Sequence, residues 1–195
     1  MKRGVRELRI VGGSLRGRKW TFADVSGLRP TPDRVRETLF NWLQPHIAGM
    51  RVLDLFAGSG ALGFEALSRG AVAAMLVESD RAAAASLRDT AALFELNAAE
   101  VQQADALAVL RQSTPSSFDL VFLDPPFAAA LLEPALDLIA RRELLAADGF
   151  CYLELPAAAP LPKLPEGWLL HRSGRAGEVG YHLLHAPSRP ISRDV

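Results

Sequence analysis

The feature that most constrains the fold of this chain is a strand pattern followed by a helix pattern, repeated from residue 51 onward. Short apolar runs occur near residues 51–56, 72–78, 100–104, 118–124 and 149–155, and helical spacing separates them. This alternation indicates an α/β protein with a parallel sheet, right-handed crossovers and helices on both faces. Ligands bind such sheets at the carboxyl ends of the strands, so a site is expected there.

The two ends of the chain depart from this alternation. Residues 168–173 and 179–184 are predicted strands with only a short glycine-containing turn between them, which places one antiparallel strand in the sheet. Before the sheet, residues 8–13 and 17–22 are predicted to form a small β-hairpin. A helix should follow, with Thr31 as N-cap, Pro32 in its first turn and Pro45 after its end. We therefore expect a basic hairpin extension over 1–30, a catalytic α/β domain over 31–187 and a disordered tail over 188–195.

Composition fits one globular domain, because 195 residues with 49% hydrophobic content can bury a core. No apolar run reaches the roughly 18 residues of a membrane span, and the charged start lacks an apolar signal core. A cytoplasmic protein is expected. The one cysteine, Cys151, lies in an apolar strand pattern, so we expect a buried and unreactive thiol. The four histidines form no ligand cluster with it, and no metal is expected.

The net charge of zero hides an uneven distribution. Residues 1–36 hold ten Lys and Arg against three Asp and Glu, whereas residues 37–195 hold twelve against nineteen. A basic arm on an acidic body suits contact with a phosphate backbone, although a solvated surface is the alternative. Trp20 and Phe22 interleave with the charges, which favours nucleic-acid binding. The expected contacts are Arg9, Arg16, Arg18, Lys19 and Arg29.

A glycine-rich turn follows the first strand of the alternating region. Asp54 lies near the end of that strand, and the glycines from Gly58 to Gly63 let the backbone approach a ligand before a helix begins near Ala61. The same residues satisfy the dinucleotide pattern GxGxxG, and Glu78 ends the next strand, where a ribose-binding acid belongs. By itself the turn fits NAD and S-adenosylmethionine about equally.

Three acidic residues favour S-adenosylmethionine. Asp54 would repel a pyrophosphate but suits the ammonium end of S-adenosylmethionine, and Glu78 can accept from both ribose hydroxyls. Asp105 can accept from the adenine amino group while the Ala106 amide donates to the ring; roles as N-caps or turn residues are the alternative. The expected cofactor contacts are Asp54, Ala57, Gly58, Ser59, Gly60, Glu78, Ser79, Asp105 and Ala106.

The segment Asp124-Pro-Pro-Phe127 ends another predicted strand. Its prolines, Pro125 and Pro126, fix φ and withhold two N–H groups, so the turn mainly accepts hydrogen bonds. The Asp124 carboxylate and the Pro125 carbonyl can hold the two protons of a planar amine, and Phe127 can stack on a base. These four residues are the expected catalytic set, with a rigid turn as the alternative. Methyl transfer to an exocyclic amino group follows if both motifs face one cleft, because such displacement needs positioning and charge stabilisation.

Four blocks, at residues 9–19, 28–42, 54–63 and 124–127, together resemble the bacterial RsmD family, over about Arg9 to His185. Enzymes of that family methylate N2 of a guanine in 16S ribosomal RNA. The resemblance implies a class I S-adenosylmethionine-dependent methyltransferase fold, Rossmann-like, with a seven-stranded sheet. It further implies a substrate within an assembling small ribosomal subunit, and a segment from Arg34 to Asn41 that closes the cofactor pocket, with Arg34 as a contact. We expect a monomer.

Other functions stay open at this point. A DNA adenine-N6 methyltransferase uses a similar corner and is the second choice; no separate target-recognition domain is expected, because the predicted catalytic sheet accounts for nearly all of these residues. A non-catalytic RNA-binding assembly factor would not need intact Gly58, Glu78 and Asp124. A protein-glutamine methyltransferase would more typically carry Asn at position 124. A nicotinamide dehydrogenase would bind NAD rather than S-adenosylhomocysteine.

Overall fold

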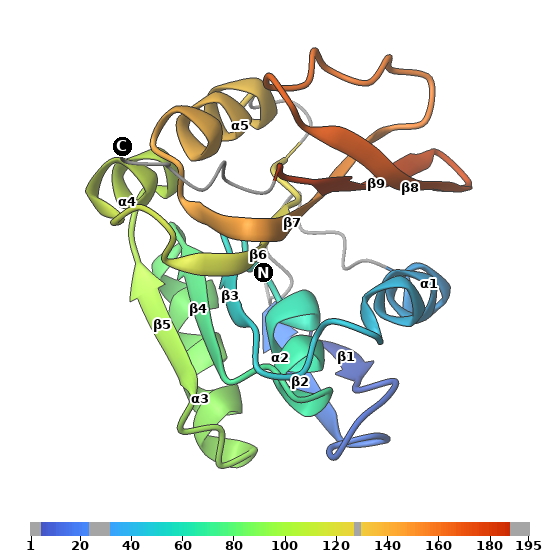
Figure 1. Ribbon diagram of the computed structural model, residues 1–195. Helices are drawn as coiled ribbons and strands as arrows, with labels where there is room; N and C mark the ends of the chain where they lie inside the picture. The colour runs from blue at the N-terminus through green and yellow to red at the C-terminus, as the bar shows by residue number, and fades with distance from the viewer. Residues whose placement is uncertain (1–4, 24–31, 127–129, 188–195) are drawn as a thin grey trace.

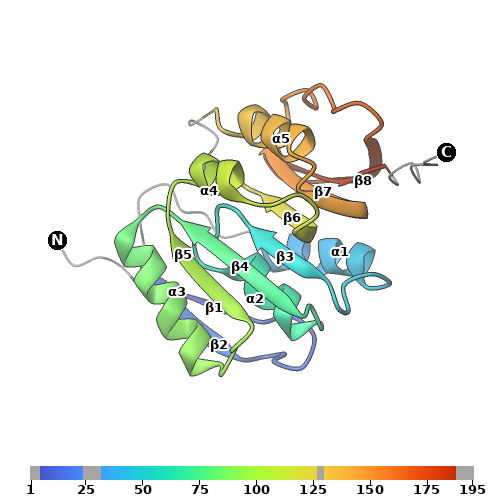
Figure 2. The ribbon, with the colours of Figure 1, turned by 60° about the vertical axis from the view of Figure 1, so that its left-hand side comes forward.

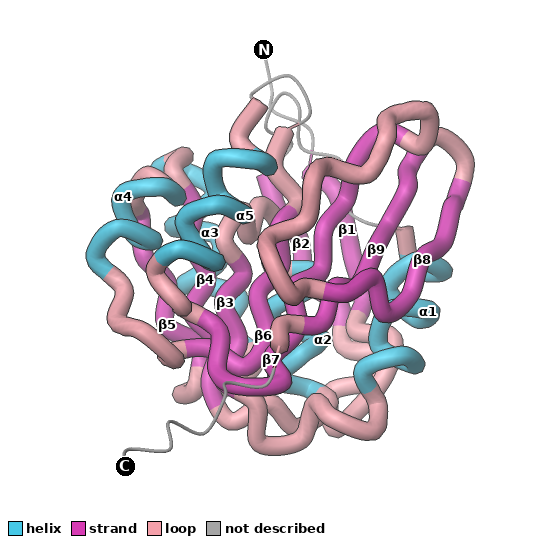
Figure 3. The backbone as a smooth tube through the Cα atoms, turned by 45° about the horizontal axis from the view of Figure 1, so that its top comes forward, coloured by secondary structure: helices cyan, strands magenta, loops and turns pink. Residues whose placement is uncertain are grey.

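A seven-stranded sheet forms the centre of the computed structural model, which describes residues 5–23, 32–126 and 130–187 (Figure 1). The strands, in sheet order, are β5 (Ala99–Gln103), β4 (Ala73–Glu78), β3 (Arg51–Asp54), β6 (Phe118–Leu123), β7 (Leu145–Pro156), β9 (Val179–His185) and β8 (Leu169–Ala176) (Figure 3). From β5 to β7 all pairs are parallel, whereas β9 runs antiparallel to both β7 and β8. The prediction of a mostly parallel sheet with one reversed strand from a terminal hairpin is confirmed.

Helices cover both faces of the sheet (Figure 2). They are α1 (Asp33–Leu43), α2 (Ala61–Ser68), α3 (Arg81–Leu93), α4 (Ala106–Gln112) and α5 (Leu132–Arg141). Successive residues of β6 point to opposite faces of the sheet and enter different cores. Phe122 belongs to the core formed with α1, α2 and α3, whereas Val121 belongs to the core formed with α4 and α5. Burial on both faces explains why the central strands are continuous apolar runs. No helix within the described ranges is long and apolar enough to cross a membrane.

Several predicted boundaries were wrong. β7 begins four residues before the expected position, and its pairing with β6 shifts register between Phe118 and Leu120. Helix α1 is preceded by Pro32 at the N-cap, without a side-chain hydrogen bond, and Thr31 lies outside the described residues. The pairing of β8 with β9 also shifts, between Leu170 and Arg172. The tail from residue 188 lies outside the described residues as well.

The N-terminal hairpin consists of β1 (Val5–Arg9) and β2 (Lys19–Ala23), and it packs on the same face as α2 and α3 (Figure 2). Its strands are thus separated by a longer connection, residues 10–18, than expected. Trp20 and Phe22 are only 2% and 4% exposed. The expectation that these aromatic rings support nucleic-acid contact is therefore wrong, because both point into the core.

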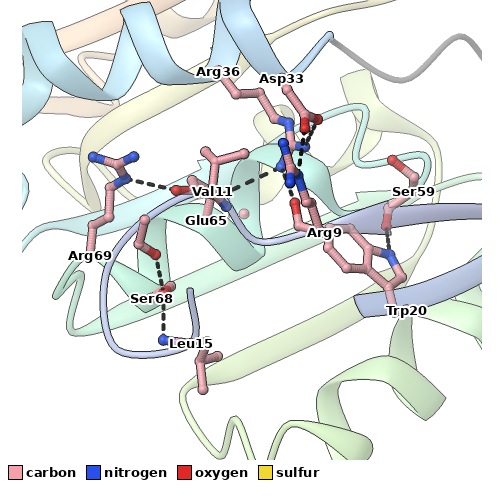
Figure 4. A network of polar contacts seen from close by, with 12 residues as sticks. Arg9, Val11, Leu15, Trp20, Asp33, Arg36, Ser59, Glu65, Ser68 and Arg69 are labelled. Atoms are coloured by element: carbon pink, nitrogen blue, oxygen red, sulfur yellow. Dashed lines mark hydrogen bonds and ion pairs between the residues drawn. The ribbon is translucent and has the colours of Figure 1, made fainter. Parts of the chain in front are cut away.

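Polar contacts attach the hairpin connection to α2 (Figure 4). The Ser68 hydroxyl donates to the Gly12 carbonyl at 2.6 Å and accepts from the Leu15 N–H at 2.9 Å. The Ser68 carbonyl accepts from the Ser14 N–H at 2.8 Å. Gly13 has a φ of 77°, and a β-carbon there would overlap this carbonyl. A glycine is therefore required where the connection touches the helix.

A buried ion pair joins the hairpin, α1 and α2 (Figure 4). The side chains of Arg36 and Glu65 are both fully buried, with Nη1 and Oε2 3.6 Å apart. Arg36 also donates to the Arg9 carbonyl at 2.9 Å and to Asp33 at 2.6 Å. Glu65 accepts from the Val11 N–H at 2.8 Å and from Arg69 at 2.7 Å. Three segments distant in sequence are fixed by one pair of charges.

The substitution Glu65→Ala should lower the free energy of unfolding by about 3–5 kcal/mol, because it removes the fully buried carboxylate that faces Arg36 and Arg69 and leaves the buried Arg36 guanidinium with only the partly exposed Asp33. Urea unfolding monitored by circular dichroism measures this. The matched control is Asp137→Ala, which removes an exposed pair with Arg141 and should cost less than about 1 kcal/mol. Equal, small losses in both variants would contradict the assigned role.

Candidate active site

The carboxyl ends of β3 and β6 lie side by side, which brings the two sequence motifs together. Asp54 is opposite Phe122 in the parallel register, and the Leu55 N–H donates to the Phe122 carbonyl at 3.2 Å. Asp124 follows Phe122 by two residues, so it lies on the same face of the sheet as Asp54. The glycine turn and the proline corner therefore adjoin at one edge of the sheet.

The glycine turn needs its glycines at two positions. Gly58 and Gly60 have φ values of 51° and 79°, in the left-handed region. Gly60 is the N-cap of α2, and a β-carbon there would overlap the Phe64 ring beneath it. Ala57 and Ser59 are buried. The backbone is thus shaped to approach a ligand at the start of α2.

Asp54 is buried beneath this turn. It is 3% exposed, and its Oδ2 accepts from the Gly63 N–H at 2.9 Å. Burial raises the pKa of Asp54 to about 7; the Gly63 N–H opposes this, and the negative charge of Glu78 adds to it. A bound cation would favour the ionised form, so the carboxyl group is suited to a positively charged ligand.

The other predicted cofactor residues lie at the ends of β4 and β5. Glu78 accepts from the Gly58 N–H at 3.0 Å and from the Asp80 N–H at 2.8 Å, so its carboxylate is held against the glycine turn. The exposed Ser79 follows it. Asp105 caps α4 by accepting from the Ala108 N–H at 2.8 Å, and Ala106 is the first residue of that helix. Asp105 has the N-cap role that was its alternative; its adenine contact stays a prediction.

The proline corner begins at Asp124, which is half-buried; Pro125 is buried and Pro126 exposed. Phe127 lies outside the described residues, so its stacking role stays a prediction. Burial, followed by the negative charges of Glu154 and Asp54, raises the pKa of Asp124 well above its usual range. The corner therefore combines an acceptor-rich backbone with a carboxyl group that neighbouring charges strongly influence.

Glu154 and its hydrogen-bond partner Tyr152, both at this edge, were not predicted from the sequence. Leu123 is opposite Leu153 in the register of β6 and β7, so Glu154, the next residue of β7, lies beside Asp124. Glu154 is 4% exposed, and its Oε1 accepts from the Tyr152 hydroxyl at 2.8 Å. The signal in the sequence was an acid at an alternating position of an otherwise apolar strand, Cys151 to Leu155. Cys151 itself is buried, and burial raises the pKa of its thiol.

Asp54, Asp124 and Glu154 thus lie on one face of three neighbouring strands. Charges of one sign held together in a poorly hydrated place repel one another, and a cation relieves this repulsion. In the part of the chain that the structure describes, no group of three or more His, Cys, Asp or Glu residues could hold a metal ion. The three acids are suited to a positively charged ligand.

The predicted phosphate contacts are distributed over the hairpin. Three of them pair within the protein: Arg9 with Asp33 at 2.9 Å, Lys19 with Glu7 at 2.8 Å, and Arg18 with the Leu93 carbonyl at 2.9 Å. All three are exposed, as is Arg16 on the connection. Arg29 lies outside the described residues. Arg34, the predicted cofactor contact on α1, is on the exposed side of the helix, whereas Arg36 faces α2.

In the absence of ligand, the substitution Asp54→Asn should make the free energy of unfolding less dependent on pH. Because the folded-state pKa is raised above the unfolded value, protonation stabilises the fold at low pH, and this contribution is lost between about pH 4 and pH 7. The free energy of unfolding of the wild type should fall more steeply there, by at most about 1.4 kcal/mol per pH unit.

Urea titrations at a series of pH values measure this difference. Asn keeps an acceptor for the Gly63 N–H, and the exposed Asp137→Asn is the control. Parallel curves for Asp54→Asn and the wild type would contradict the raised pKa.

Known proteins are similar to this chain over almost its whole length. The family model "Conserved hypothetical protein 95" matches residues 8–185. The ribosomal RNA small subunit methyltransferase D of Escherichia coli is 47% identical over 181 residues, which are 92% of this chain and 90% of that protein. The enzyme of the same name from Haemophilus influenzae is 43% identical over 180 residues, 91% of this chain and 93% of that protein.

A solved structure agrees with these matches. That of yhhF from Escherichia coli superimposes with a TM-score of 0.84 at 44% identity, covering 94% of this chain and 100% of that chain. Identity at this level over nearly the full length of both proteins extends from the hairpin to the terminal strands. The chain therefore belongs to the RsmD family of methyltransferases, as its four sequence blocks indicated.

Proposed function

We propose that this protein transfers a methyl group from S-adenosylmethionine to the N2 amino group of a guanine in 16S ribosomal RNA. The observation that carries the proposal is the adjacency of the glycine turn and the Asp124 corner at the ends of β3 and β6. The names of the Escherichia coli and Haemophilus influenzae relatives support ribosomal RNA of the small subunit as substrate.

The glycine turn and its neighbours fit the proposed cofactor. Gly58 and Gly60 allow close approach of the backbone, Glu78 stands at the turn for the ribose, and Asp105 with Ala106 lies at the next strand end for the adenine. Asp54 offers a negative charge beneath the turn. When bound, S-adenosylmethionine supplies an electrophilic methyl group on a positively charged sulfur.

Asp124 is the residue that activates the amine in this proposal. The lone pair of an amino group attached to a base is delocalised into the ring, so the amine is a weak nucleophile. Acceptors at the Asp124 carboxylate and the Pro125 carbonyl hold its two protons and favour a pyramidal nitrogen. As positive charge moves onto that nitrogen, the carboxylate stabilises it, and the proton then leaves to Asp124 or to water.

A direct test is to incubate the purified protein with small ribosomal subunits and S-adenosylmethionine labelled in the methyl group. Mapping the label by nuclease digestion and mass spectrometry should place it on N2 of one guanine of 16S ribosomal RNA. Label on another atom, or on DNA supplied in parallel, would contradict the proposed specificity.

The substitution Asp124→Ala should lower kcat by about a hundredfold or more, because it removes the acceptor that develops its strongest interaction as the amine becomes positive. The affinity for S-adenosylhomocysteine, measured by calorimetry, should change less than threefold. Asp119→Ala is the control on the same strand, since it breaks an exposed pair with Arg51 at the opposite end of β6. Normal turnover of Asp124→Ala would refute the role.

Arg16→Gln should weaken binding to small-subunit RNA and reduce the slope of log K against log salt by about 0.7–0.9, as expected for one lost phosphate contact. The guanidinium of Arg16 is exposed on the hairpin connection. Arg141→Gln, on α5 at the other face of the sheet, should leave the slope unchanged. Filter binding at several salt concentrations measures both, and equal slopes for Arg16→Gln and wild type would exclude this contact.

A further inference from the structure

One side chain of the N-terminal hairpin reaches the cofactor turn. The indole Nε1–H of Trp20 donates to the carbonyl of Ser59 at 2.9 Å, in a buried hydrogen bond (Figure 4). The two residues are 39 positions apart in the chain. Ser59 lies between Gly58 and Gly60, so the accepted oxygen belongs to the part of the backbone that approaches the proposed cofactor.

The peptide group between Ser59 and Gly60 is hydrogen-bonded at both its carbonyl and its N–H. The Gly60 N–H, on the same peptide as the Ser59 carbonyl, donates to the Ala57 carbonyl at 2.7 Å. Both polar groups of the Ser59–Gly60 peptide are therefore held, one within the turn and one by Trp20. Rotation of that peptide would break both bonds and would redirect the N–H groups at the start of α2.

The indole is itself held in place. Its ring packs edge to face against Phe64 and Phe94, with ring centroids 6.0 Å apart in each case. Phe64 also lies directly beneath Gly60. The orientation of the N–H is thus set by the core on which the turn rests, as is usual for a buried tryptophan that has a single donor.

The connection between β1 and β2 carries the exposed basic residues Arg16 and Arg18. Residues 10–18 are attached to α2 through Ser68 and Glu65, and Arg18 is attached to the end of α3 at the Leu93 carbonyl. The same guanidinium lies 4.6 Å above the Phe94 ring, the ring that supports Trp20. A contact made at Arg18 is therefore separated from the cofactor turn by only Phe94 and Trp20.

We propose that Trp20 is a positioning residue for the cofactor turn, and that through it substrate RNA held at the hairpin and the cofactor strengthen each other's binding. The identity of both ligands rests on the proposed function. Coupling of this kind is reciprocal, because an RNA that favours the ordered turn must bind more tightly when the cofactor is present.

The test is Trp20→Phe, which keeps an aromatic ring but removes the donor to Ser59. The affinity for S-adenosylhomocysteine, measured by calorimetry, should fall about two- to tenfold, the effect of one neutral buried hydrogen bond. Phe150→Leu is the matched control, because it truncates a buried aromatic ring of the same core that packs on His46 rather than on Trp20. The affinity of Phe150→Leu for S-adenosylhomocysteine should stay within twofold of the wild type. Thermal unfolding should show that Phe150→Leu and Trp20→Phe are both destabilised.

The coupling is measured by repeating the titrations with a transcript of small-subunit ribosomal RNA at saturation. The RNA should raise the affinity of the wild type, and the increase should be smaller in Trp20→Phe. Unchanged affinity in Trp20→Phe, an equal loss in Phe150→Leu, or no effect of RNA on the wild type would overturn the proposal. Failure of the wild type to bind S-adenosylhomocysteine at all would instead contradict the proposed function.

Discussion

The pairing of β3 with β6 is the constraint on which the candidate site depends. These strands are far apart in sequence but adjacent in the sheet, and their parallel register sets Asp54 opposite Phe122. Two motifs, each of modest meaning alone, become one site because parallel neighbours end at the same edge. The helices and the hairpin then serve to hold that edge: α2 starts from one motif, and the Arg36–Glu65 pair fixes α2 to the rest of the molecule.

The electrostatics of this edge suit the proposed reaction. Three carboxyl groups, those of Asp54, Asp124 and Glu154, are close enough that burial and mutual repulsion raise the pKa values of the first two. A sulfonium ion supplies the positive charge that such a group of acids lacks. Once the methyl group has moved, the sulfur is neutral and the charge is on the acceptor nitrogen beside Asp124, so the same acids that favour the cofactor do less to retain its product.

The fold was largely predictable, because the alternation of strand and helix patterns and the terminal hairpin follow from local spacing. Asp54 and Asp124 could also be selected as candidate site residues from the sequence, since each ends an apolar run. Glu154 was not, because its relevance depends on β7 lying beside β6, and sequence spacing alone does not determine strand order. Trp20 was misinterpreted for a related reason: charges that alternate with aromatic residues show that a strand has two faces but not which face is buried.

The irregular edge of the sheet has its own consequence. β8 is the outermost strand at one edge of the sheet. Leu169, which is 65% exposed, lies next to the register shift between Leu170 and Arg172. A regular outer strand offers a continuous row of amide and carbonyl groups to any extended segment that approaches. Here the row is interrupted and flanked by the positive charges of Arg172 and Arg175. Edge-on stacking of one molecule against another, the first step toward fibrillar aggregation, is thereby disfavoured.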